Sequence, residues 1–341
     1  MNPAILSKIY KDAYAPIFGI MLFTALDLNL PTLLLEPKTL SDLSELTFAN
    51  QAKLDHMLKI LSVHGYFSYN EQTQQWSNSP SSAALTDDSL SKSMKLLLWP
   101  YKYEYLSSYP ESIKHQISCH DVHFGFDYFS GIMNNREILP IYRDGVNAME
   151  NLFISRLRDI GLGECQKVLE LAGGEGNLMV YLAEQYPHIT GAVLERYEVI
   201  DMIQKNIYEH NLQERIMAIN GDMLGDLPTD YDCIIIKHSL CEWDNNCVKN
   251  IISNARKALQ AGGKFKWMDK FAVENSKKYL HTTIHEMEDI RTIRTLEESQ
   301  NLLTECGFRV EKIENSLRDE FINIDMEVNP ASEYIIHSVA I

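Results

Sequence analysis

The residues best suited to chemistry follow a single apolar run. The segment KHSLCEWDNN (237–246) comes directly after Cys233-Ile234-Ile235-Ile236, a run typical of a buried strand. Its reactive side chains are a base, an imidazole, a thiol, a carboxylate and an indole, carried by Lys237, His238, Cys241, Glu242 and Trp243. One strand end therefore offers groups that can move protons and a flat surface that can stack on a ring.

Glycines and acids follow other apolar runs. In the segment ELAGGEG (170–176), glycine lets the backbone turn sharply and a ligand approach closely, and a helix start follows, whose amide groups point outward. Glu195 comes 19 residues after Gly176, where a carboxylate can bind both hydroxyls of a ribose. Asp222 precedes Met223, a polarizable neighbour suited to an adenine.

These segments belong to a region, 165–341, in which short apolar runs alternate with helical patterns. This alternation predicts a mostly parallel sheet with helices on both faces. Residues 307–313 and 334–341 form two apolar runs with no good helix between them, which predicts an antiparallel pair at one edge. In such sheets, ligands bind beyond the carboxyl ends of the strands, where the strand order reverses. The chemistry-bearing segments should therefore meet at one edge of the sheet.

A nicotinamide cofactor fits this region poorly. The GxGxxG pattern fails because Met179 stands three residues after Gly176. Glu175 also places a negative charge at the helix start, where a pyrophosphate would have to bind. A nucleoside cofactor without phosphates suits the loop better.

The first 110 residues follow a different pattern. A helical period in KLDHMLKILSVH (53–64) leads into GYFSYNEQTQQWSNSP (65–80), two alternating segments around a polar turn. Helices followed by a small hairpin are typical of winged-helix domains. The net charge of −16 and the isoelectric point near 5.1 argue against phosphate contacts with nucleic acid. A protein–protein role is the better interpretation.

The cellular location is inferred from composition. The six cysteines are scattered without a CxxC pair, which is typical of reduced cytosolic thiols. The first residues lack the pattern of a signal peptide, and the apolar stretch 15–35 is interrupted by Asp27, Asn29 and Pro31. We expect a cytoplasmic protein with no membrane or nucleic-acid partner.

Taken in order, these segments resemble the S-adenosylmethionine-dependent class I O-methyltransferases of small molecules. That family includes plant caffeic acid and hydroxyindole O-methyltransferases and bacterial antibiotic-tailoring relatives. The resemblance covers nearly the whole chain and rests on LDLNLPTLL, LDHMLKILSVHGYFSYN, FDYFSG, YRDGVNAMENLF, VLELAGGEG, VLERYEVI, NGDMLGDLP, KHSLCEWDNN, WMD and RTLEESQNLLTECGF.

The resemblance implies a fold, a domain division and an assembly. The fold class is α/β: a Rossmann-like class I methyltransferase domain with a mostly parallel seven-stranded sheet and an antiparallel final strand. A mostly α winged-helix dimerisation domain precedes it. The implied boundaries are 1–110 for the dimerisation domain, 111–160 for linking helices and a substrate-pocket segment, and 161–341 for the catalytic domain. A homodimer is expected, because family members are typically homodimers.

The resemblance also implies S-adenosylmethionine as cofactor and a role for each residue near it. The glycines would run under the methionine portion, Glu195 would hold the ribose, and Trp243 would cover the adenine held by Asp222 and Met223. The implied cofactor-binding residues are Glu170, Gly173, Gly174, Gly176, Glu195, Asp222, Met223, Lys237 and Trp243.

The chain departs from the family pattern where the chemistry takes place. Cys241 occupies the position of the family's general-base histidine, Asp269 matches one of the two carboxylates that hold that histidine, and Ile293 replaces the other. Ala172 stands where the family usually has its first glycine. A thiol, with a usual pKa of about 8.5, is a poor base at neutral pH, so Cys241 is interpreted as a small neutral residue.

Three alternatives follow from this departure. The acceptor could be nucleophilic already, so that positioning suffices; another histidine, among His238, His281 and His285, could serve as base; or the cofactor could support a reaction other than methyl transfer. The candidate catalytic residues are Cys241, Asp269 and His238. Because side chains alternate along a strand, we expect His238 to point to the opposite face from Lys237. A structural role for His238 fits the sequence as well as a catalytic one.

The substrate residues implied by the family's substrate-lining region are aromatic. They are Phe126, Tyr128, Phe129 and Tyr142, which could instead pack at a domain junction. His281 and His285 share one helix face, with Glu286 and Asp289 nearby, so they could form a metal pair. No spacing dictates a third ligand, so we interpret them as pocket-lining or surface residues and predict no metal.

The expected function combines these points. We expect a methyltransferase that acts on a small, partly apolar metabolite of specialised metabolism, by in-line transfer driven mainly by positioning. The alternative is an enzyme of the same fold that binds S-adenosylmethionine without transferring its methyl group.

Overall fold

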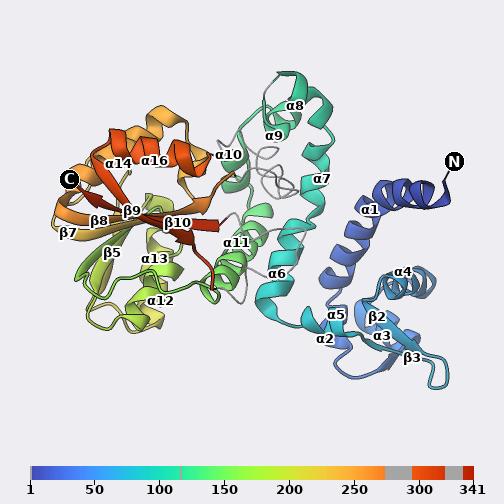
Figure 1. Cartoon of the computed structure of the whole chain (residues 1–341). Coiled ribbons are helices and arrows are strands. Elements are labelled where there is room, and N and C mark those ends of the chain that lie inside the picture. Colours follow the sequence, from blue (N-terminus) through green and yellow to red (C-terminus); the bar gives the residue numbers. More distant parts are fainter. Residues whose placement is uncertain (1, 116, 273–293, 319–332) are drawn as a thin grey trace. The chain divides into compact units, whose positions relative to one another are not determined.

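The computed structural model describes residues 2–115, 117–272, 294–318 and 333–341 (Figure 1). They form two units. The N-terminal unit comprises Met1–Ser107 and Phe129–Leu152, and the sheet unit comprises Ser108–Tyr128 and Phe153–Ile341. The domain boundaries implied by the family resemblance stay a prediction. No helix among the described residues is long and apolar enough to cross a bilayer.

The N-terminal unit consists of helices and a small three-stranded sheet. Its elements are α1 (Pro3–Asp27), α2 (Leu30–Leu33), β1 (Lys38–Thr39), α3 (Leu40–Thr47), α4 (Gln51–Val63), β2 (Phe67–Asn70), β3 (Gln75–Asn78), α5 (Pro80–Ala84), α6 (Asp88–Leu97) and α7 (Pro100–Leu106). A capping box between Thr39 and Asp42 begins α3, and the side chain of Asn50 caps α4. β2 pairs antiparallel with β3, so the hairpin predicted in 65–80 is confirmed.

The sheet unit contains seven strands in the order β6-β5-β4-β7-β8-β10-β9. They are β4 (Lys167–Leu171), β5 (Thr190–Glu195), β6 (Ile216–Asn220), β7 (Tyr231–Lys237), β8 (Leu259–Lys270), β9 (Phe308–Asn315) and β10 (Glu333–Ala340). The pairs among the first five are parallel, whereas β10 is antiparallel to both β8 and β9. The predicted fold class, including the antiparallel final strand, is confirmed. The strand order reverses between β4 and β7, which places a ligand site beyond their carboxyl ends.

Helices cover both faces of this sheet (Figure 1). The helices of the unit are α8 (Tyr109–His115), α9 (Cys119–Phe124), α12 (Asn177–Gln185), α13 (Tyr197–Glu209), α14 (Asn245–Ala258) and α16 (Leu296–Glu305); α10 (Tyr128–Met133) and α11 (Ile138–Ile154) lie at the boundaries of the two units. On one face, α14 and α16 bury Ile251 and Leu303 with Ile234 of β7. On the other face, α12 and α13 bury Leu182 and Ile203 with Ile235 of the same strand. The apolar run of β7 is therefore buried on both sides, as a central parallel strand requires.

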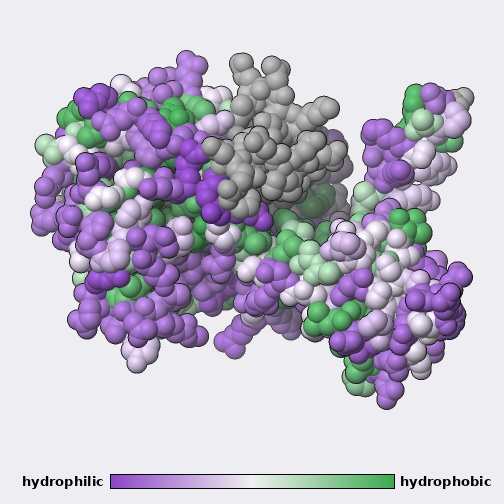
Figure 2. All heavy atoms as spheres, turned by 60° about the horizontal axis from the view of Figure 1, so that its bottom comes forward, coloured by the Kyte–Doolittle hydropathy of each residue, from purple (hydrophilic) through white to green (hydrophobic). Residues whose placement is uncertain are grey.

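The two units differ in the apolar residues that they expose. The face of the sheet unit visible in Figure 2 carries mostly hydrophilic side chains. In the N-terminal unit, α1 exposes about half of the surface of Ile5, Ile9, Tyr14 and Ile17, at 55%, 55%, 59% and 49%. Several exposed apolar residues are thus concentrated on α1, although the sheet unit also exposes Tyr197, Tyr208 and Met217.

Candidate active site

The glycine-rich loop after β4 has three residues in the left-handed backbone region. Ala172, Gly174 and Gly176 have φ values of 52°, 57° and 78°. Among the described residues, no atom lies within 4 Å of the point where a Cβ of Gly174 would stand, so this side of the loop is open. At Gly173, a Cβ would lie 2.6 Å from Val193 Cγ1, and only glycine fits there. Ala172 keeps the conformation typical of the glycine it replaces, at a cost of roughly 1–2 kcal/mol.

Two glutamates contact this loop from different sides. Glu195, at the end of β5, accepts a hydrogen bond from the backbone N–H of Gly174 at 3.2 Å and one from Arg196 at 2.9 Å. Glu170 is 1% exposed and accepts from the N–H of Met179 at 3.2 Å. Its carboxylate thus holds the start of α12 beneath the loop, while Glu195 lies beside the open side.

The loop after β6 is held by α14. Asp222 accepts from the N–H of Leu224 at 2.9 Å. The side-chain amide of Asn254 donates to the carbonyl oxygens of Met223 and Leu224 at 3.4 and 3.0 Å, and that of Asn250 donates to Leu224 at 3.1 Å. Sequence reasoning missed both asparagines, although their spacing of four on one helix face was a usable signal.

Cys241 lies in a short 3₁₀ turn, Leu240–Glu242, directly after β7. Its backbone N–H donates to Asp269 Oδ2 at 3.2 Å, and the indole N–H of Trp267 donates to the same oxygen at 3.2 Å. The other oxygen of Asp269 accepts from the N–H of Lys270 at 2.9 Å. The structure thus brings Cys241 and Asp269 together. Asp269 is only 2% exposed, and its carboxylate accepts a hydrogen bond from the backbone N–H of Cys241.

Arg294 holds the same turn from a second side. Its guanidinium donates to the carbonyl oxygen of Leu240 at 2.8 Å, to Asn245 Oδ1 at 2.7 Å, and to the carbonyl oxygen of Trp243. Burial lowers the pKa of Arg294, and the negative charge of Asp269 opposes that shift. No role was predicted for Arg294, because no pattern in the sequence around it indicates a hydrogen bond to Leu240, 54 residues earlier.

His238 and Lys237 lie on the same side of the sheet, contrary to expectation. The ring of His238 packs edge-on to that of Phe153 with centroids 4.9 Å apart, and Lys237 Nζ lies 5.8 Å from the centroid of the same ring. The prediction of opposite faces is wrong because His238 has a φ of 51°, which ends the alternation of the strand. Its Nε2 lies 2.8 Å from Oε2 of Glu333 on β10.

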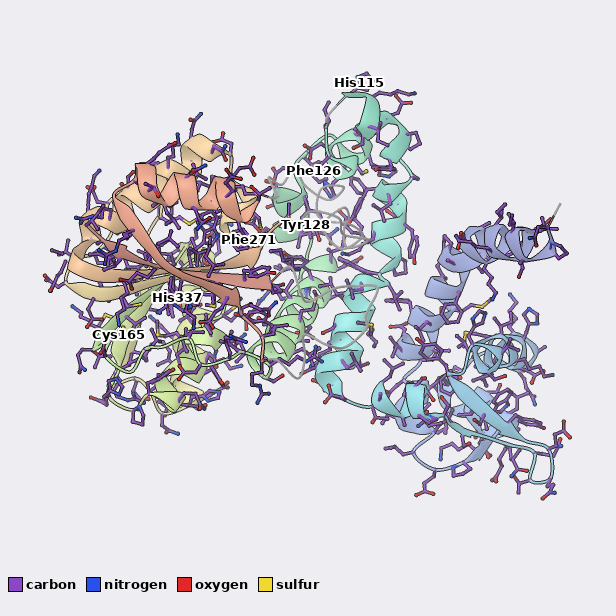
Figure 3. All side chains as sticks on the ribbon, in the orientation of Figure 1. His115, Phe126, Tyr128, Cys165, Phe271 and His337 are labelled. Carbon is purple, nitrogen blue, oxygen red and sulfur yellow. The ribbon has the colours of Figure 1, made fainter. Side chains whose placement is uncertain are left out.

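Part of the expected substrate set packs around a buried histidine. Phe126 and Tyr128 lie with ring centroids 5.5 and 5.4 Å from that of His120 (Figure 3). Tyr128 is 3% exposed, whereas Phe126 is 48% exposed. Burial lowers the pKa of His120. Tyr128 therefore belongs to a local aromatic cluster, and Phe126 presents its ring outward.

The other expected substrate residues stay predictions. Phe129 and Tyr142 belong to the N-terminal unit. His281, His285 and Asp289 lie outside the described residues. Within the described ranges, no three His, Cys, Asp or Glu side chains are grouped so as to hold a metal ion.

Comparison with known proteins defines the class. A family model described as an O-methyltransferase domain matches residues 103–309, which is more than half of the chain. The chain belongs to this O-methyltransferase family, as the motifs predicted. Among curated proteins, mitomycin biosynthesis 6-O-methyltransferase of Streptomyces lavendulae is 23% identical over 257 residues, covering 73% of either chain. A shorter match is aclacinomycin 10-hydroxylase of Streptomyces purpurascens, 25% identical over 107 residues, which cover 31% of this chain and 29% of that one.

Solved structures share the fold over the full length. Mitomycin 7-O-methyltransferase superposes with a TM-score of 0.86 at 19% identity, covering 99% of this chain and 98% of that one. Human N-acetylserotonin methyltransferase, solved in complex with S-adenosylmethionine, gives a TM-score of 0.81 at 16% identity and covers 100% and 98%. The structural neighbours thus include methyltransferases that hold this cofactor.

Proposed function

We propose that the protein binds S-adenosylmethionine at the carboxyl ends of β4, β5, β6 and β7 and transfers its methyl group to a small, partly apolar metabolite of specialised metabolism. The observation that carries the proposal is the contact between Glu195 and Gly174. It puts a carboxylate beside the open side of a glycine loop at the point where the strand order reverses.

The residues at these strand ends fit the cofactor. Gly174 leaves room for close approach of the methionine portion, and the carboxylate of Glu195 suits the ribose hydroxyls. The indole of Trp243 is partly buried against the core that also contacts Met223, and its Nε1 has no hydrogen-bond partner among the described residues. Glu170, Gly173, Gly176, Asp222 and Lys237 complete the proposed cofactor site. Bound there, the cofactor would supply an electrophilic methyl group on a sulfonium.

The chain's own contribution is positioning. The turn that carries Cys241 and Trp243 is held by Asp269 and Arg294, so its backbone is fixed before a ligand binds. Holding an acceptor in line can by itself lower a barrier by about 7–11 kcal/mol. Phe126, Phe129, Tyr142, His281, His285 and Asp289 stay proposed substrate residues, and we propose no metal.

Calorimetry with S-adenosylmethionine and S-adenosylhomocysteine tests the cofactor site. The wild type should bind both. Glu195→Gln should weaken binding about 10–100-fold, because a charged hydrogen bond contributes about 1.5–3 kcal/mol. Glu198→Gln is the matched control, since Glu198 is exposed on the adjoining helix, and it should bind like the wild type. Absence of heat with both ligands in the wild type would contradict the proposal.

Mass spectrometry then tests the transfer. Phenols, naphthols, aromatic amines, thiols and carboxylic acids are incubated with the enzyme and S-adenosylmethionine. A product heavier by one methylene, formed together with S-adenosylhomocysteine, supports methyl transfer and identifies the acceptor atom.

The second candidate is an enzyme of this fold that uses the cofactor without transferring its methyl group. The replacement of the family's base by Cys241 favours it, and the match to a hydroxylase shows that another activity occurs among the relatives. Incubation with S-adenosylmethionine alone distinguishes the two candidates. Conversion of the cofactor into a product other than S-adenosylhomocysteine, with no methylated acceptor in the panel, would favour this alternative.

We also propose that the protein is a homodimer through its N-terminal unit. Ile5, Ile9, Tyr14 and Ile17 of α1 are each about half exposed, which leaves apolar surface on this helix for a second copy to cover. Sedimentation should show a dimer at micromolar concentration. Ile9→Glu combined with Ile17→Glu should give monomers. A monomeric wild type would contradict this proposal.

A further inference from the structure

We propose that His238, oriented by Glu333, is the general base that takes the proton of the acceptor, in place of the residue at position 241. This inference rests on the proposed function, since it assigns a role within the same site. It starts from a histidine–carboxylate pair formed between β7 and β10, strands that are not neighbours in the sheet.

The backbone places His238 at the ligand edge of the sheet. β4 and β7 are paired in parallel with Leu171 opposite Ile236, so the glycine loop and His238 leave the sheet side by side. The N–H of His238 donates to the carbonyl oxygen of Met268 at 2.9 Å, which ties the residue to β8 as well. Its positive φ turns the side chain toward Phe153 and Glu333.

The contact with Glu333 selects one tautomer. A carboxylate only accepts hydrogen bonds, so the 2.8 Å contact requires a proton on Nε2 of His238. A neutral imidazole then has its lone pair on Nδ1. Nδ1 makes no hydrogen bond within the described part of the chain. The side chain of His238 is 30% exposed and that of Glu333 is 9% exposed, which leaves the ring reachable while its orienting partner is buried.

The charged groups around the pair favour this arrangement. Lys270 Nζ, at the end of β8, lies 3.8 Å from the second oxygen of Glu333, so the carboxylate faces a positive charge on one side and the imidazole on the other. Lys237 Nζ lies 5.8 Å from the centroid of the Phe153 ring, against which His238 also packs. Asp269, the nearest other acid on β8, is already bonded to the backbone N–H groups of Cys241 and Lys270 and to the indole of Trp267.

The proposed step is a proton transfer coupled to methyl transfer. Nδ1 of His238 takes the proton of the acceptor's O–H or N–H group as the acceptor's lone pair forms the bond to the methyl carbon. The carbon–sulfur bond breaks, and its electron pair stays on the sulfur. The imidazolium that forms is paired with Glu333. General-base assistance of this kind contributes about 10²–10⁴-fold to the rate.

Nuclear magnetic resonance of the protein alone tests the orientation. The protein is labelled with ¹⁵N-histidine, and the signals of His238 are assigned from their loss in His238→Gln. The inference expects a proton on Nε2 and none on Nδ1 in the neutral ring, and a changed tautomer ratio in Glu333→Ala. A proton on Nδ1 in the wild type would overturn it. This measurement needs neither cofactor nor acceptor.

Acceptors of different acidity test the chemistry. The phenol or naphthol methylated in the panel is compared with its nitro derivative, which is ionised at neutral pH. His238→Gln should lower kcat about 10²–10³-fold for the weakly acidic acceptor and less than tenfold for the ionised one. Equal losses for both would show a structural role and overturn the inference, as would unchanged rates.

A second histidine–carboxylate pair provides a matched control. His210 Nδ1 lies 2.8 Å from Glu184 Oε1, with 44% and 48% of the two side chains exposed, on helices α12 and α13. His210→Gln should leave kcat unchanged with either acceptor. S-adenosylhomocysteine binding distinguishes failure of this inference from failure of the proposed function. If the wild type does not bind S-adenosylhomocysteine, the proposed function is wrong. If it binds, but His238→Gln loses the same kcat with both acceptors, only the role of His238 is wrong.

Discussion

Two histidines of the sheet unit, His238 and His337, each have a glutamate and a lysine among the groups around them, but their surroundings differ. At the strand ends, His238 meets Glu333 through Nε2, and its Nδ1 makes no hydrogen bond in the described part of the chain. Inside β8, β9 and β10, His337 has Nδ1 3.0 Å from Lys266 Nζ and Nε2 3.0 Å from Glu314 Oε1 (Figure 3).

The ring of His337 is enclosed within the sheet: its Nδ1 bonds to Lys266, and its buried Nε2 lies beside Glu314 without a well-aligned hydrogen bond. Glu314 also pairs with Arg158 at 2.6 Å and with Lys312 at 2.8 Å. Burial lowers the pKa of His337 to about 4, and the positive charge of Lys266 acts in the same direction. The same residue types thus build a closed internal network in one region and an imidazole with one available nitrogen in the other. Residue type alone does not distinguish a base from a structural group; the exposure of the ring does, at 30% for His238 and 14% for His337.

The largest expected effect is the difference between the two histidines in catalysis. His238→Gln should lower kcat about 10²–10³-fold with a weakly acidic acceptor, whereas His337→Gln should leave kcat within about threefold because its ring faces only the internal network. Steady-state kinetics with the acceptor found in the panel measures both. A comparable loss of kcat in both variants, with folding intact, would remove the distinction drawn here.

Removal of the guanidinium that holds the turn after β7 should have the next largest effect. Arg294→Lys cannot reproduce three hydrogen bonds to Leu240, Trp243 and Asn245. We expect a loss of about 2–4 kcal/mol in the free energy of unfolding, because buried carbonyl groups lose their donor, together with weaker S-adenosylhomocysteine binding.

Arg158→Lys is the matched comparison in the internal network. Arg158 donates to the carbonyl oxygen of Leu317 and to Glu314, so its replacement should destabilise the protein without altering S-adenosylhomocysteine affinity. Denaturant unfolding and calorimetry separate the two effects. Weaker ligand binding in Arg158→Lys than in Arg294→Lys would contradict the assignment of Arg294 to the site.

A smaller effect concerns the pH dependence of stability. The folded pKa of His337 is about 4, below the usual value of about 6.5 in an unfolded chain. Between these values the unfolded state binds more protons, so this group's contribution to stability is full above pH 6.5 and is lost as the pH falls toward 4. The charged groups facing it are Lys266, Glu314, Lys312 and Arg158.

His337→Asn isolates this contribution. The melting temperature of the wild type should fall more steeply between pH 6.5 and 4 than that of the variant, by several degrees, as expected for a change on the order of 1 kcal/mol. Differential scanning calorimetry across this window measures it. Parallel curves for the two proteins would mean that His337 is not held neutral by its surroundings.

The smallest expected effect is at Cys241. Cys241→Ala should keep kcat within about tenfold of the wild type, because the thiol is a poor base and the position of the turn depends on its backbone N–H. The same kinetic assay applies, with circular dichroism as a check of folding. A decrease in kcat of more than about a hundredfold would indicate that the thiol of Cys241 is the general base.

Much of the fold could be predicted from local patterns. The βαβ alternation, the glycine loop and the acids at the strand ends are encoded by residues near one another in the chain, and the period of side-chain burial follows from backbone geometry. The contact between Glu195 and Gly174 could be expected for the same reason, since adjacent parallel strands bring their carboxyl ends to one edge.

The partners at the strand ends could not be predicted in this way. Glu333 lies 95 residues from His238, and Arg294 lies 54 from Leu240. No period or spacing links such pairs, because the order in which distant strands join the sheet decides them. The left-handed φ of His238 was also invisible, since only a few per cent of non-glycine residues adopt positive φ and no local pattern marks this one.

The sequence by itself determined the two-sided burial of the sheet and the set of groups available for chemistry, because these depend on local periodicity and residue type, and its ordered motifs resembled the family to which the chain belongs. Only the tertiary structure decided which histidine is partly exposed beside a buried glutamate, that Asp269 holds a backbone amide, and that Arg294 supports the turn. The physical reason is that hydrogen bonds between distant segments form only when packing of the whole sheet brings their donors and acceptors within about 3 Å.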